Sequence, residues 1–181
     1  MPSSPYTVAI TDRQKSLKLD QRRLVRVARS VLSSEGVLRA DISVALVDNR
    51  EMHVINRNFL RHDYPTDVLS FLLDEEPSPR GKKSIRARAP RGAGKSLDGE
   101  VIISTEYARA EADLHDWEPE SEVLLYLVHG LLHLCGYDDV SDAERRVMRA
   151  REIELLSKWK LVPPYTLAAG KTRKRKLQIE K

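Results

Sequence analysis

The spacing of apolar positions along the chain predicts four strands and about five helices. Alternating or short apolar runs, which are typical of strands, cover residues 6–11, 41–47, 68–72 and 100–103. Longer segments that fit a helical period cover residues 20–34, 48–60, 104–114, 120–135 and 141–159. The sequence contains no internal repeat, and this mixture of strands and helices predicts an α+β fold.

Polar residues and glycines support several of the predicted helix boundaries. Asp48 with Glu51, and Ser141 with Glu144, have the spacing of a capping box, in which the first side chain accepts a hydrogen bond from the backbone three residues later. Gly136 follows the helix predicted at 120–135 and is a natural left-handed stop.

The helix predicted at 120–135 carries the most informative side chains. It is apolar nearly all round, which is typical of a buried helix, yet it contains His129 and His133. Residues four apart share one helix face, so both imidazoles can point to the same place. Burying two polar rings without partners is unfavourable, and a shared divalent cation removes that penalty.

Asp139, just past the helix stop, is the predicted third ligand of one zinc ion, with the fourth coordination position left for water. Asp138 is the rival third ligand, because a shift of one residue in a turn is open at this stage. Cys135 follows His133 by two residues and therefore lies on another helix face. The alternative interpretation is a pair of core histidines bonded to backbone, but the acid pair and the helix stop favour a metal site.

The segment from His129 to Asp138 reads His-Gly-Leu-Leu-His-Leu-Cys-Gly-Tyr-Asp and resembles the signature of the YbeY family of bacterial metal-dependent endoribonucleases. Residues 55–71 and 99–104 resemble two further blocks of this family, in the family's order. The resemblance implies a zinc-dependent, single-strand-specific endoribonuclease that acts in late small-subunit ribosomal RNA maturation, including 3′ end processing, and in ribosome quality control. It also implies a mixed sheet of about four strands packed against the helices, with the metal in a cleft beside the histidine helix.

Two positions depart from the family pattern. The signature closes with a third histidine as metal ligand, and that position is Asp139 here. A site with two imidazoles and one carboxylate suits zinc but is harder and more anionic, so it can accept other divalent ions. An arginine that handles RNA phosphate in many members falls on Leu60, and the neighbouring Arg61 is the candidate substitute for binding substrate.

The formal net charge of +4 is distributed unevenly. Residues 80–95 hold seven cations and no acid, and residues 170–181 hold six cations against one acid, so the rest of the chain carries 4 − 7 − 5 = −8. Both segments read as flexible, and they would attract RNA phosphates without regard to base sequence. The alternative is a solvated loop and a solubilising tail.

Composition sets the remaining expectations. A chain of 181 residues suits a single domain, predicted at 1–162 with a flexible basic insert at about 75–97, followed by a basic and disordered tail at 163–181. The apolar runs are too short to span a bilayer, the first residues lack the pattern of a signal peptide, and the single cysteine excludes an internal disulfide. We therefore expect a cytoplasmic protein with no membrane partner.

Other functions and roles remain open at this level. Metallopeptidases also use His-x-x-x-His, but their general base is a glutamate directly after the first histidine, and this chain has Gly130 there. A third hypothesis is a ribosome-assembly factor that binds RNA and uses zinc only to hold its fold. Asp138 or a water is the candidate for proton transfer. Arg61 and His62 are candidates for stabilising charge on the phosphate. Glu122 is a candidate for orienting His129.

Overall fold

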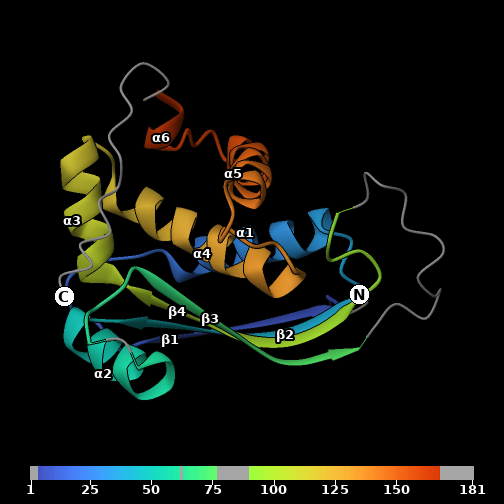
Figure 1. The fold of residues 1–181 in the computed structure, drawn as a ribbon, viewed down its shortest axis with the longest axis horizontal. Helices are drawn as coiled ribbons and strands as arrows, with labels where there is room; N and C mark the ends of the chain where they lie inside the picture. Colours follow the sequence, from blue (N-terminus) through green and yellow to red (C-terminus); the bar gives the residue numbers. More distant parts are fainter. Residues whose placement is uncertain (1–3, 62, 77–89, 168–181) are drawn as a thin grey trace.

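The computed structural model describes residues 4–61, 63–76 and 90–167, without the side chain of Leu60. The described elements follow one another in the order of Figure 1: β1 (Tyr6–Asp12), α1 (Gln21–Ser34), β2 (Arg39–Val47), α2 (Asn49–Leu60), β3 (Val68–Glu76), β4 (Ser96–Ser104), α3 (Thr105–His115), α4 (Pro119–Cys135), α5 (Asp142–Ser157) and α6 (Pro164–Leu167).

The four strands form one mixed sheet in the order β1-β2-β4-β3. β1, β2 and β4 are parallel, and β3 pairs antiparallel with β4 along one edge. This agrees with the predicted α+β fold and its mixed four-stranded sheet. β3 and β4 are both longer than their apolar runs indicated, because the polar ends of the two strands stay paired across a bulge between Leu72 and Asp74.

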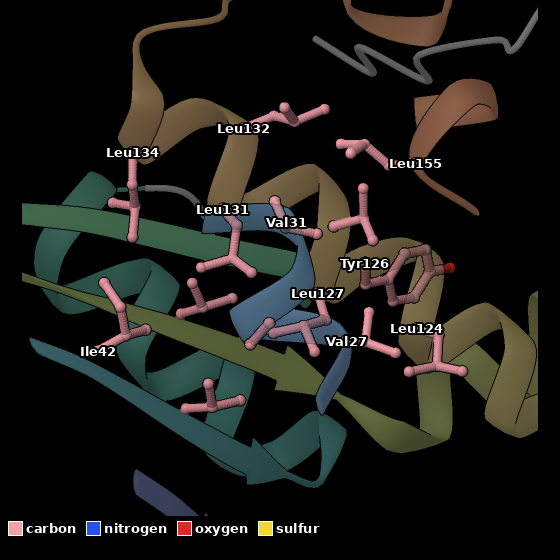
Figure 2. Packing of buried hydrophobic residues seen from close by; sticks show 14 of the residues in the cluster. Val27, Val31, Ile42, Leu124, Tyr126, Leu127, Leu131, Leu132, Leu134 and Leu155 are labelled. Carbon is pink, nitrogen blue, oxygen red and sulfur yellow. The ribbon is translucent and has the colours of Figure 1, made fainter. Parts of the chain in front are cut away.

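The two faces of the sheet carry different cores. α1 and α4 cover one face, whereas α2 lies against the other, as Figure 1 shows. On the first face, leucines of α4 interdigitate with Val27 and Val31 of α1 and with Ile42 of β2 (Figure 2). Each fully buried leucine or valine contributes roughly 1.5–3 kcal/mol of transfer free energy, so this face holds most of the stabilising apolar contact.

α4 is the central helix of the protein, buried nearly all round as its sequence predicted. It lies across β3 and β4 and also packs against α1, α3 and α5. Two glycines permit the close approach to the sheet. A Cβ atom added at Gly130 would lie 2.7 Å from Val101 Cγ1, and one added at Gly99 of β4 would lie 2.9 Å from Leu134 Cδ1.

The predicted capping residues have their expected roles. Asp48 and Ser141 accept hydrogen bonds from the backbone N–H groups of Glu51 and Glu144, at 2.8 and 3.2 Å. One element was not anticipated: the short helix α6 occupies the first part of the segment predicted as a tail. Among the described residues, none of the helices has the length and apolar character needed to cross a membrane.

Candidate metal centre

The end of α4 and the turn after it build the candidate site. Gly136 takes the left-handed conformation at φ 101°, and its N–H donates to His133 O. The next N–H, of Tyr137, reaches back to Leu132 O at 3.0 Å and closes the turn. A residue with a side chain would be strained at this φ, so the glycine allows the chain to fold back over the last turn of α4. The two aspartates that follow are thereby returned toward the helix.

The imidazoles of His129 and His133 face each other across one helical turn. Their Nε2 atoms lie 3.0 Å apart. On the opposite side of each ring, Nδ1 contacts an acceptor: Glu152 Oε1 at 2.6 Å from His129, and Tyr137 O at 3.1 Å from His133. A carbonyl or carboxylate oxygen only accepts, so each Nδ1 carries the proton and donates. Both Nε2 lone pairs consequently point into the same small space.

Asp139 completes the cluster. Its Oδ1 lies 3.8 Å from His133 Nε2, and one ligand atom from each of His129, His133 and Asp139 falls within 4.8 Å of the other two. Asp138 is engaged differently, because its Oδ1 accepts from the backbone N–H of Asp139 at 2.7 Å. Cys135 is fully buried, away from the cluster. The geometry therefore favours Asp139 over Asp138 as the third group.

This donor set could hold a metal ion. Two neutral imidazoles and a carboxylate are a common set for catalytic zinc, and a tetrahedral ion with bonds of about 2.0–2.1 Å would separate its nitrogen ligands by roughly 3.3 Å. Ligating histidines ordinarily donate their other N–H to a carboxylate or a carbonyl, as both rings do here. The three side chains remain 26%, 27% and 43% exposed, which leaves the cluster open to solvent.

Electrostatics distinguish the two histidines. Burial lowers the pKa of His129, but the hydrogen bond and charge of Glu152, followed by the charges of Asp67 and Asp139, outweigh burial and leave this pKa raised. Burial and the charge of His129 lower the pKa of His133, against the opposing charge of Asp139. Without a metal, a proton on one of the two Nε2 atoms would satisfy their 3.0 Å contact. Metal binding must displace that proton.

The carboxylate that orients His129 was not found from the sequence. Glu122, seven residues earlier on the same helix, was a candidate, but the partner is Glu152 of α5, 23 residues further along the chain. Glu122 lies instead beside Tyr126, where its charge adds to burial in raising the tyrosine pKa. Glu152 is only 3% exposed, and no local pattern in α5 marks it as a functional residue.

Gly130 stands where the peptidase arrangement has its glutamate, and it lies in close contact with the sheet. Val101, which its added Cβ would approach to 2.7 Å, is itself fully buried. A larger side chain at position 130 would therefore require α4 or Val101 to move. The position that supplies the base in His-Glu-x-x-His enzymes is used here for packing α4 onto β4.

Two cations of the predicted basic insert contact the site turn. Arg91 donates to Gly136 O at 3.0 Å and lies over the Tyr137 ring, 4.9 Å from its centroid. Lys95 donates to Cys135 O and pairs with Glu75, both at 3.2 Å. These two side chains brace the turn. The other five cations of the insert and the whole of 170–181 lie outside the described residues.

Arg61, the predicted substrate-binding residue, follows α2 as its left-handed C-cap at φ 59° and is exposed. His62 and the side chain of Leu60 lie outside the described part of the structure. The structure thus brings three of the four predicted site residues together and leaves Arg61 at the end of α2, outside the cluster.

Comparisons with known proteins place the chain among relatives that share one name. A family model described as endoribonuclease YbeY matches residues 9–160. Proteins named endoribonuclease YbeY include one from Salinibacter ruber, 36% identical over 156 residues, covering 86% of this chain and 94% of the relative. Another, from Syntrophotalea carbinolica, is 36% identical over 153 residues, covering 83% of this chain and 94% of the relative.

A solution structure of a Thermotoga maritima protein superposes with a TM-score of 0.53, covering 93% of this chain and all of that one, at 20% identity. This likeness supports the fold. The match to the family model and the identity to its named relatives, over nearly their whole length, show that the chain belongs to the YbeY endoribonuclease family.

Proposed function

We propose that this protein is a single-strand-specific endoribonuclease that binds one zinc ion through His129, His133 and Asp139. The observation that carries the proposal is the pair of Nε2 atoms that lie 3.0 Å apart, with an acceptor at the Nδ1 atom of each ring. Two facing lone pairs are unfavourable unless a proton or a cation lies between them, and the names of the relatives supply RNA as the substrate.

The chemistry divides between the metal and the chain. A bound divalent ion would polarise a phosphoryl oxygen and lower the pKa of a water. Glu152 holds His129 in the Nδ1-protonated tautomer, and the turn carbonyl of Tyr137 does the same for His133. Asp139 contributes one negative charge, and its partial exposure leaves room for a phosphodiester to approach. Arg61 is our candidate for binding substrate phosphate, as a charge-assisted donor.

The biological setting belongs to the same proposal. We assign the enzyme to late maturation of small-subunit ribosomal RNA, including its 3′ end, and to ribosome quality control, in the cytoplasm. The family resemblance supports this assignment. So do the sequence of residues 80–95 and 170–181, whose cations suit a polyanionic partner, and the single cysteine, which suits a reducing compartment.

One experiment tests the ligand set. Zinc content and cleavage of a single-stranded RNA are measured for the wild-type chain and for His133→Ala, Asp139→Ala and Asp138→Ala, with His115→Ala as a control histidine on the exposed side of α3. We expect the first two variants to lose both zinc and cleavage and the control to keep both. If Asp139→Ala keeps its zinc and Asp138→Ala loses it, the third ligand is Asp138 and not Asp139.

The same samples test the reaction itself. A chelator should abolish RNA cleavage by the wild-type chain, zinc should restore it, and duplex RNA should be cut less than single strands. Stoichiometric zinc with no cleavage of either RNA would refute the enzyme and support an assembly factor in which the metal only stabilises the fold.

A further inference from the structure

Glu152 has a second partner besides the histidine. While its Oε1 accepts from His129 Nδ1 at 2.6 Å, its Oε2 accepts from the hydroxyl of Tyr165 at 2.5 Å. Both oxygens of this buried carboxylate are therefore satisfied, one by a ring of the candidate metal site and the other by the short helix α6.

The chain is folded back to place Tyr165 there. After α5 ends, a turn with Lys160 in the left-handed conformation reverses its direction, and Leu161 N–H donates to Leu156 O at 3.2 Å. Pro164 then begins α6 close to α5, as Figure 1 shows. A short element that is stable only through such tertiary contacts is well suited to hold one side chain in a fixed place.

The Tyr165 ring is fixed independently of its hydroxyl. The Arg149 guanidinium lies over the ring, 5.2 Å from its centroid, and the ring also packs against the main core. Burial, followed by the charge of Glu152, raises the tyrosine pKa, so the phenol keeps its proton and acts as the donor. Removal of the hydroxyl alone would therefore leave the ring in position.

We propose that Tyr165 is a positioning residue for the metal centre, which acts through Glu152 to hold the imidazole of His129 toward the ion. This inference rests on the proposed function, because it assumes that His129 is a ligand. A carboxylate bonded at both oxygens has one orientation, whereas a carboxylate bonded only to His129 can rotate about its side-chain torsions. The hydroxyl thus limits the rotation of the group that sets the direction of His129 Nε2.

A pair of matched variants tests the proposal. Tyr165→Phe removes the hydroxyl that donates to Glu152 Oε2. Tyr6→Phe removes a hydroxyl of the edge strand β1, which donates to Val37 O at 2.8 Å. Zinc dissociation constants are measured by competition with a chromophoric chelator, and thermal unfolding is measured on the metal-free proteins. Partners of metal ligands typically change affinity by about 10–100-fold, so we expect Tyr165→Phe to weaken zinc binding by roughly tenfold.

The expected pattern is a weakened zinc affinity in Tyr165→Phe alone, with similar small losses of thermal stability in both variants. Wild-type zinc affinity in Tyr165→Phe, or equal weakening in Tyr6→Phe, would overturn the proposal and leave the proposed function intact. If the wild-type chain binds no zinc, both the proposed function and this inference are refuted. The two failures are therefore distinguishable.

Discussion

Substitution of Gly130 by alanine tests whether the contact between α4 and the sheet governs the position of the histidines. The added Cβ would lie 2.7 Å from Val101 Cγ1, although carbon atoms in contact prefer about 3.5–4.0 Å. Either the helix or the valine must move by roughly 1 Å. Val101 is fully buried and β-branched, with a restricted side-chain torsion, so we expect much of the displacement to fall on α4.

Two opposing effects set the size of the change. Overpacking a dense core costs about 1–3 kcal/mol, whereas alanine in place of glycine inside a helix gains up to about 1 kcal/mol. The free energy of unfolding should therefore fall by about 1–2 kcal/mol. In urea this is a decrease of roughly 0.5–1 M in the midpoint for a slope of about 2 kcal/mol/M. His129 precedes the substituted residue directly, so zinc affinity should fall as well.

Urea unfolding of the metal-free protein, followed by circular dichroism, gives the stability, and chelator competition gives the zinc affinity. The control is a double-mutant cycle with Val101→Ala, which removes both methyl groups that the added Cβ would contact. The two substitutions should couple favourably by about 1–2 kcal/mol, because the new methyl then occupies vacated space. A Gly130→Ala protein as stable as the wild type, or a cycle without coupling, would contradict the steric argument.

Three further predictions follow from named contacts. Glu152→Gln should weaken zinc binding by about 10–100-fold in a chelator competition, because the amide is a poorer acceptor for His129, and unchanged affinity would remove Glu152 from the site. Arg151→Met should lower the free energy of unfolding, measured by urea titration, by about 3–5 kcal/mol, because it leaves the fully buried Glu35 without its 2.7 Å ion pair. A loss below about 1 kcal/mol would show that another group compensates the charge of Glu35. Zinc affinity should fall as pH decreases through the raised pKa of His129, since a proton on Nε2 competes with the metal; affinity independent of pH between about 5 and 8 would refute imidazole ligation.

Much of the site was accessible from local sequence. The pair of histidines, the glycine stop and the acid after it lie within eleven residues, so helix geometry alone brings His129 and His133 together and returns the chain near them. The capping residues Asp48 and Ser141 likewise act within four positions of themselves. Interactions of this range are encoded in periodicity and spacing, which is why the predicted helices agree closely with the observed ones.

The rest depends on contacts between distant segments. Glu152 and Tyr165 reach the site only because α5 packs on α4 and the chain then reverses, and neither residue has a neighbour in sequence that signals this. The length of β3 beyond Leu72 is set by pairing with β4, against the weak strand propensity of Asp74 and the residues after it. The sequence shows that Gly130 departs from the peptidase pattern. The reason for a glycine at this position is its close contact with Val101 on β4, which only the structure shows.

β3 forms one edge of the described sheet, and this edge combines apolar and acidic character. Leu72 and Leu73 are 46% and 64% exposed. An exposed apolar edge strand favours pairing with a strand of a second copy, which is a route to aggregation. Asp74, Glu75 and Glu76 follow immediately, and like charges brought face to face along such an edge repel each other. These carboxylates therefore oppose strand addition by a second copy, and replacing them with uncharged residues would leave Leu72 and Leu73 on an edge without that repulsion.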